Sequence, residues 1–341
     1  MYRKLVKISL VLVYLVIIAG AVVRMTGSGM GCPDWPKCFG YYIPPTEITE
    51  LEFQSGRVYK EGQVIIVEES LMTAQENFTS GEIYNPQNWE KYTKHNYAIF
   101  NPWHTWIEYI NRLFGALAGL AVLIMAFLSL KYWREHKKIT LLSWLAVFLM
   151  GFQGWLGATV VFSVLSPVKI TIHMVMALVI VALILYLLNI SSEKNNNKIA
   201  FKSFRTLTFF AVIFTLIQII MGTQVRQFVD EQIKLLGYGA PELWLSKPSI
   251  LFYIHRSFSI LVLILNILLW WQNKKMKLGF SKMNWVLVFI GLEIITGIAM
   301  YNFNFPALSQ PLHLVIATLL FGVQFYVLLE AFRTPIRVKS L

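Results

Sequence analysis

Eight long apolar stretches alternate with polar segments along the chain. They lie at 8–25, 103–130, 139–162, 169–190, 205–226, 250–272, 284–302 and 310–331. A helix needs about 20 apolar residues to cross the roughly 30 Å hydrocarbon core of a bilayer. The pattern therefore predicts an all-α integral membrane protein with eight transmembrane helices.

Composition supports this fold class. Hydrophobic residues make up 56% of the chain and charged residues only 14%, whereas soluble domains carry about 25% charged residues. A disordered chain is excluded on this ground, and an ordinary soluble enzyme is disfavoured.

Basic residues are concentrated in alternate polar segments, on one side of the predicted membrane. Eighteen lie there, against the three acids Glu135, Glu193 and Glu330; they are Arg3, Lys4, Lys7, Lys131, Arg134, Lys137, Lys138, Lys194, Lys198, Lys202, Arg205, Lys274, Lys275, Lys277, Lys282, Arg333, Arg337 and Lys339. Positive charge marks the cytoplasmic side, so both termini are predicted to be cytoplasmic. This distribution explains the net charge of +12 without a nucleic acid partner.

Residues 26–102 form one long polar insert on the opposite side. The insert carries ten acids and five bases, so it resembles a soluble segment rather than a span. Within it we expect a short strand at Val64–Val67 and a short helix at Met72–Glu76. Cys32 and Cys38 flank a turn-forming segment with two prolines, and the predicted oxidising compartment permits a disulfide. A redox-active dithiol and two free thiols are the alternatives.

The chain repeats itself at the level of four spans. The pattern G-x-x-V-R ends the first span at Gly20–Arg24 and the fifth at Gly222–Arg226. The pattern Y-I-x-R occurs in spans two and six, and a histidine follows Gln153 and Glu293 by 20 residues in the corresponding pairs of spans. We therefore predict two parallel-repeated four-helix bundles, residues 1–190 and 191–341. The first span has a counterpart, so its Ala19-Gly20-Ala21 match to a signal cleavage site is not expected to be cut.

Histidines inside the spans are the first candidates for chemistry, because ionisable residues in a bilayer are costly and mark function by default. His255 and His313 lie at similar depth near the outer ends of their helices, so two imidazoles can face one flat cofactor such as haem. The alternative is a hydrogen bond from each histidine to a neighbouring helix. Zinc and copper are disfavoured, since Glu293 is the only further ligand type at that depth.

Other charged residues surround these positions. Glu108 is an intramembrane acid with Arg112 one helical turn later, and the second half has Phe252 in its place. It can assist chemistry beside a cofactor or form a structural ion pair. Four arginines are candidates for binding haem propionates or lining haem, with lipid headgroups as the alternative partners for the first two: Arg24, Arg226, Arg112 and Arg256.

Together these motifs resemble the haem A synthase family, whose members oxidise a methyl group of haem O to the formyl group of haem A. The match is carried by GAVVRMTGSGMGCPDWPKC at 20–38, by Glu108-x-x-x-Arg112, by His255-Arg256, and by the segments around His173 and His313. The resemblance implies two successive hydroxylations at the methyl carbon followed by loss of water, giving haem A for terminal oxidases.

The resemblance also implies the roles of individual residues. His255 and His313 would bind haem b in the C-terminal half, His173 would bind the iron of the substrate haem O in the N-terminal half, and Glu108 would be the catalytic carboxylate. Implied partners are haem O, the haem O-producing enzyme, membrane lipid and an unidentified electron acceptor; assembly into a homo-oligomer stays open. A b-type cytochrome limited to electron transfer and a proton-coupled transporter are the alternative functions.

One position departs from the family pattern. Many members have histidine where this chain has Asn111, and asparagine is a poor haem ligand. His104 lies seven residues earlier on nearly the same helix face, but about 10 Å closer to the outer end. We therefore expect His173 alone to bind the substrate iron, with His104 as a weaker candidate.

Overall fold

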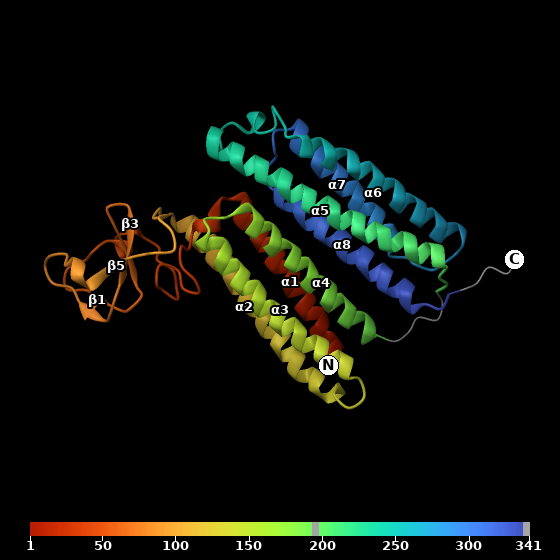
Figure 1. Cartoon of the computed structure of the whole chain (residues 1–341), viewed down its shortest axis with the longest axis horizontal. Helices are drawn as coiled ribbons and strands as arrows, with labels where there is room; N and C mark the ends of the chain where they lie inside the picture. The colour runs from red at the N-terminus through yellow and green to blue at the C-terminus, as the bar shows by residue number, and fades with distance from the viewer. Residues whose placement is uncertain (193–197, 337–341) are drawn as a thin grey trace. The chain divides into compact units, whose positions relative to one another are not determined.

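The computed structural model describes residues 1–192 and 198–336, and it contains eight helices long and apolar enough to cross a membrane (Figure 1). They are α1 (Tyr2–Met25), α2 (Pro102–Ser129), α3 (Lys137–Phe162), α4 (Pro167–Ile190), α5 (Lys202–Leu236), α6 (Ile250–Lys275), α7 (Met283–Asn302) and α8 (Ser309–Arg333). The prediction of eight spans is confirmed, and the chain is a multi-pass membrane protein. Among the charged residues used to predict orientation, Glu193, Lys194, Arg337 and Lys339 lie outside the described residues.

Helix α5 is longer than the apolar pattern predicted. The sequence becomes polar after Arg226, yet the helix continues to Leu236 and ends before Gly237, whose φ is 81°. An ion pair of 2.8 Å between Arg226 and Asp230 supports the extension along one helix face. Trp244 packs on Val229 and Ile233 of the same extension. The ion pair and the tertiary packing thus stabilise the part of α5 that lies beyond the apolar stretch.

The long insert contains five short strands arranged in two antiparallel sheets. They are β1 (Val58–Tyr59), β2 (Val64–Val67), β3 (Ser70–Ala74), β4 (Phe78–Thr79) and β5 (Trp89–Lys91), paired as β1-β4 and β2-β3-β5. The aromatic side chains of Tyr59 and Trp89 lie at the centre of its core, with ring centroids 4.9 Å apart. The predicted strand at Val64–Val67 is confirmed.

The predicted helix at Met72–Glu76 is wrong, because this segment lies largely in β3. The chain turns between β2 and β3 at Glu68 and Glu69, whose φ values of 46° and 58° are both positive. Two such residues make the tight turn that matches the twist of a hairpin. Glycine or asparagine normally signals this turn, and Glu-Glu gives no such signal. Pairing of β3 with both β2 and β5 then outweighs local helix preference.

Contacts divide the chain into two compact units. One comprises Met1–Tyr14, Leu120–Met150 and Met174–Leu341; the other comprises Leu15–Gly119 and Gly151–His173. In the first unit α5 packs on α6, α6 on α7, α7 on α8, and α8 on α5. These four helices therefore close a ring in which α6 and α8 are diagonal neighbours across the bundle interior.

A buried amide pair joins the diagonal helices α6 and α8 directly. The side-chain amide of Gln324 donates to Asn266 Oδ1 at 2.8 Å, and both side chains are fully or almost fully buried. Each residue follows a histidine of the same helix, His255 or His313, by eleven positions. Eleven residues make about three helical turns, or roughly 16 Å. The amide pair therefore lies below the histidines on the same helix faces.

Candidate functional site

His313 of α8 is held by two side chains of α7. Its Nδ1 lies 2.7 Å from the hydroxyl oxygen of Thr296 and 3.2 Å from Oε2 of Glu293. Gly297, the next residue on α7, faces the ring: a Cβ there would lie 3.7 Å from His313 Cε1, an ordinary contact distance. Helix α7 thus fixes one nitrogen of the ring and faces its edge with a glycine.

His255 of α6 faces α5 in a similar manner. A Cβ at Gly222 would lie 3.0 Å from His255 Cε1, so only glycine leaves the ring in place. One turn earlier on α5, the amide of Gln218 donates to the His255 carbonyl oxygen at 3.0 Å. His255 Nδ1 is buried without a hydrogen-bond partner among the described residues. The two imidazoles belong to the diagonal helices α6 and α8.

His173 of α4 shows the same packing in the other unit. Gly157 of α3 would place a Cβ 3.4 Å from His173 Cε1. One turn before it, the amide nitrogen of Gln153 lies 3.0 Å from the His173 carbonyl oxygen and 3.4 Å from Nε2 of the ring. Nδ1 of His173 is buried and lacks a partner among the described residues.

Asn111 of α2 occupies the position that corresponds to His255 in the repeat. Its Oδ1 is buried without a partner in the described part of the chain, and it lies 3.8 Å from where a Cβ of Gly20 would be. The four positions marked by the sequence repeat are therefore each opposed by a helix glycine: Gly20 and Asn111, Gly157 and His173, Gly222 and His255, Gly297 and His313. The internal repeat thus extends from sequence motifs to side-chain packing.

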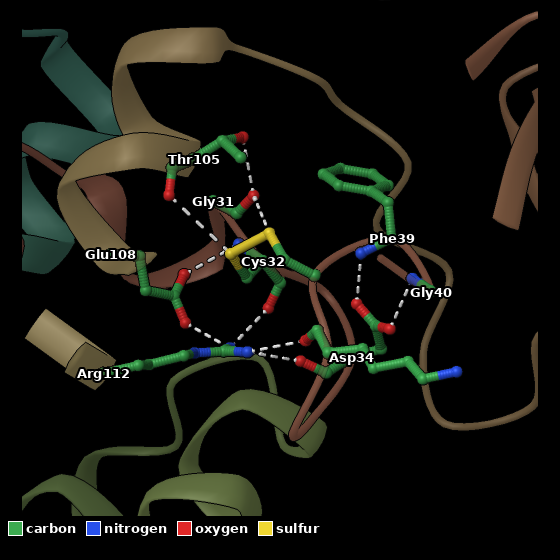
Figure 2. Close-up of a disulfide and its surroundings, with 10 residues drawn as sticks. Gly31, Cys32, Asp34, Phe39, Gly40, Thr105, Glu108 and Arg112 are labelled. Carbon is green, nitrogen blue, oxygen red and sulfur yellow. Dashed lines mark hydrogen bonds and ion pairs between the residues drawn. A yellow bond between two sulfur atoms is a disulfide. The ribbon is translucent and has the colours of Figure 1, made fainter. Parts of the chain in front are cut away.

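The cysteine loop is tied to α2 next to these positions. Cys32 and Cys38 form a disulfide with their Cα atoms 4.7 Å apart, which confirms the predicted pairing. The backbone N–H of Cys32 donates to Glu108 Oε2 at 2.8 Å, and Thr105 donates to the Gly31 carbonyl at 2.8 Å (Figure 2). Glu108 is thus a direct contact of the disulfide loop, and its side chain is almost fully buried.

Arg112 is the centre of this arrangement. Its Nη1 donates to the carbonyl oxygens of Asp34 and Lys37 at 2.7 and 2.8 Å. Its Nη2 donates to the carbonyl oxygen of Cys32 at 2.9 Å and forms an ion pair with Glu108 Oε1 at 2.5 Å (Figure 2). A guanidinium has five N–H donors, so four are already used to hold the loop and the carboxylate. Little donor capacity is left for a haem propionate.

Asp34 stabilises the loop from within. Its carboxylate accepts the backbone N–H groups of Phe39 and Gly40 at 2.5 and 2.7 Å (Figure 2). Burial raises the pKa of the Asp34 carboxyl above its ordinary value, although these two bonds and the Arg112 charge act in the opposite direction. Nearby, His95 Nε2 lies 2.9 Å from the Pro33 carbonyl oxygen, which gives this histidine a structural contact.

The remaining candidate residues lie around these positions. His104 is half-buried in the first turn of α2, where its backbone N–H is capped by Asn101 Oδ1 at 3.2 Å. Arg24 lies in the last turn of α1, and Arg226 pairs with an acid of its own helix. Arg256 is exposed, and its guanidinium lies 5.5 Å from the ring centroid of Tyr253. The structure therefore gives these arginines different surroundings, although the repeat aligns them in pairs.

The described residues contain no group of three or more His, Cys, Asp or Glu side chains that could hold a metal ion.

The chain matches the model of the family COX15-CtaA, cytochrome oxidase assembly protein, over residues 3–325. The chain belongs to this family.

Curated relatives of this cytochrome oxidase assembly protein family are named haem A synthase. One, from Alkalihalophilus pseudofirmus, is 26% identical, with 92% of each chain covered. Another, from Ehrlichia canis, is 25% identical over 93% of this chain and 89% of the relative. A third, from Shewanella oneidensis, is 31% identical, but the match covers only 54% of this chain and 43% of that relative's length. The family resemblance inferred from the motifs is thereby confirmed.

Sequence reasoning in this family member missed several contacts. Thr296 and Gln218 were not singled out, and Glu293 was considered only as a further metal ligand. The signal was present: Gln153, Gln218 and Glu293 each stand four residues before one of the repeated glycines. The polar residue one turn before three of the four glycines could have been recognised as a contact of the opposing histidine.

Proposed function

We propose that this chain is a haem A synthase that oxidises a methyl group of haem O to a formyl group and holds a second, resident haem b. The observation that carries the proposal is the fourfold packing of glycine against the repeated positions. It brings three histidines and one asparagine into equivalent places within a family whose relatives are named haem A synthase.

The C-terminal half, residues 191–341, is proposed to bind haem b through His255 and His313. The two rings come from the diagonal helices α6 and α8, and the buried Nδ1 of His255 has no partner among the described residues. These two histidines would hold haem b between α6 and α8. Haem b, when bound, supplies a one-electron redox centre.

The N-terminal half, residues 1–190, is proposed to bind haem O through His173. Asn111 stands where the C-terminal half has the ligand His255, so the substrate iron has a single protein ligand here. A single ligand suits a substrate that leaves as product. The extra acid of this half, Glu108, has no counterpart in the other, which favours a reaction site over a second electron relay.

Glu108 is proposed to act as the catalytic carboxylate. It is held by Arg112 and by the Cys32 N–H, so its position is fixed before substrate binds. Each oxygen atom accepts one of these bonds and retains a second acceptor site. Oxidation of a methyl group releases protons, and a carboxylate placed in this way can receive one at an oxygen atom and pass it to the outer loop.

We also propose the setting in which the enzyme works. The enrichment of Lys and Arg in the loops on one side of the spans supports a cell inner membrane location with both termini in the cytoplasm. The disulfide supports an oxidising compartment for the insert. The haem O-producing enzyme and an electron acceptor are the proposed partners.

The test is pigment analysis in a host that makes haem O and lacks its own haem A synthase. The wild-type chain should yield haem A, while His173→Ala should leave haem O. His255→Ala and His313→Ala should each lose the low-spin haem b spectrum of the purified protein. His136→Ala, a change in an exposed connection, is the matched control and should behave as wild type. Absence of haem A with the wild-type chain, in membranes that contain the folded protein, would refute the function.

A further inference from the structure

The two halves differ in how they hold their haem-ligating histidines, and this difference goes beyond the proposed function on which it rests. His313 has two oxygen atoms at Nδ1, whereas His173 has an amide nitrogen near Nε2. The responsible residues, Glu293 and Gln153, occupy equivalent places in the repeat. The chemical consequence depends on where each ring carries its proton.

The proton on His313 is placed by Thr296. The Thr296 hydroxyl lies 2.9 Å from the Leu292 carbonyl oxygen and 3.1 Å from the Glu293 carbonyl oxygen, and it can only donate to these. When its single hydrogen goes to either carbonyl, a lone pair faces His313 Nδ1 at 2.7 Å. In this arrangement Nδ1 is the N–H donor, which leaves the lone pair of Nε2 free for iron.

Glu293 acts at the same nitrogen. Its Oε2 lies 3.2 Å from His313 Nδ1, so it offers a second acceptor for the one N–H. Acceptors at the nitrogen remote from the metal orient the ring and increase its donor strength toward the metal. Thr296 and Glu293 therefore prepare Nε2 of His313 for a firm bond to iron.

Gln153 has the opposite effect on His173. Its nitrogen atom is identified by the bond to the His173 carbonyl oxygen, because a carbonyl oxygen accepts only from an N–H. The second N–H of the same amide is directed at Nε2, 3.4 Å away. This amide competes weakly with iron for the Nε2 lone pair, and Nδ1 has no acceptor in the described part of the chain.

We propose that Thr296 and Glu293 are positioning residues that make the C-terminal haem resident, while Gln153 keeps His173 a releasable ligand for a haem that must leave as product. The residues behind the histidines thus add to the difference in ligand number, since one half has two histidines and the other has His173 with Asn111.

The test measures haem b release from the purified holoprotein to excess apomyoglobin. Thr296→Val removes the acceptor while keeping the shape, and loss of a hydrogen bond of ordinary strength should speed release roughly fivefold. Adding Glu293→Leu should speed it further, to about thirtyfold. The midpoint potential of haem b should rise in both variants, because a weaker imidazole donor stabilises ferric iron less.

Matched variants separate this role from general damage. Thr159→Val removes a hydroxyl from α3 that donates to the Leu156 carbonyl oxygen of its own helix at 2.8 Å, and should leave release unchanged. Thr296→Ser keeps the hydroxyl and should restore slow release. If wild type holds haem b while Thr296→Val releases it at the wild-type rate with an unchanged potential, the inference is overturned and the proposed function stands. If the wild-type protein binds no haem b at all, the proposed function itself fails.

Discussion

Replacing Gly222 with alanine tests whether glycine packing sets the geometry of the proposed haem b ligand. The new Cβ would lie 3.0 Å from His255 Cε1 and 3.7 Å from each ring nitrogen. A carbon–carbon separation of 3.0 Å is well below van der Waals contact, so the ring must move by a few tenths of an ångström. The displaced ring is the one proposed to bind the haem iron.

The size of the effect follows from the energy of overpacking. Inserting a methyl group into a packed interior costs about 1–3 kcal/mol. If that cost falls on the haem-bound state, haem b affinity should drop about 5- to 150-fold. The helix itself should gain from the change, since alanine is favoured over glycine by about 0.8–1 kcal/mol in a helix interior. Loss of haem in a protein that remains folded is therefore the expected signature.

Two glycines of the same repeat provide controls. Gly297→Ala would place its Cβ 3.7 Å from His313 Cε1, and Gly20→Ala would place its Cβ 3.8 Å from Asn111 Oδ1. Both are ordinary contacts, so both variants should keep haem b close to the wild-type level. The assay is haem titration of the purified protein, followed by the low-spin optical and EPR signals.

The result that would refute the reasoning is equal behaviour of the three variants. If Gly222→Ala binds haem b as tightly as wild type, with an unchanged signal, the close approach of Gly222 and His255 does not set the ligand geometry. If Gly297→Ala is damaged to the same extent, the effect belongs to the helices in general rather than to the 3.0 Å contact.

Three further predictions concern the other half of the chain. Glu108→Gln keeps size but removes the ion pair to the neighbouring arginine; it should preserve haem b and stop haem A formation, and normal haem A levels would return Glu108 to a structural role. Cys32 and Cys38 should resist alkylation in mass spectrometry until reductant is added, and full labelling without reductant would exclude a stable disulfide in the isolated protein. The same labelling applied to Glu108→Gln shows whether the loop stays intact. In pigment analysis, Asn111→His should retain haem A formation, and His104→Ala should change the haem A content only slightly. Loss of haem A in His104→Ala would instead make that histidine a ligand.

The sequence predicted those parts of the fold that depend on local pattern. Apolar stretches predicted all eight spans, and the repeat marked four equivalent positions, three with histidine and one with Asn111, each opposed by a glycine. The end of α5 and the strand β3 were missed because the apolar pattern does not register the Arg226–Asp230 ion pair, the Trp244 contact or the strand pairing that decide them. Tertiary context of this kind overrides propensity.

The candidate site was predictable in its residues but not in its bonds. Glu108 and Arg112 one turn apart suggested an ion pair, which the structure confirms. The sequence could not show that Arg112 donates to the backbone carbonyl oxygens of Asp34 and Lys37. Every residue has a backbone carbonyl, so residue types do not reveal which ones accept. Likewise, the proton position on His313 depends on where the Thr296 hydroxyl points.

The amide pair between Asn266 and Gln324 has a consequence for how the holoprotein is assembled. It joins the diagonal helices roughly 16 Å below the two histidines, so no flat macrocycle fits between α6 and α8 at that depth. A haem arriving after this bundle has closed must therefore enter from the end of the bundle that carries the histidines or sideways from the lipid, and cannot pass along the bundle axis from the opposite end. The order of bundle closure and cofactor entry thus decides which routes to the proposed haem site stay open.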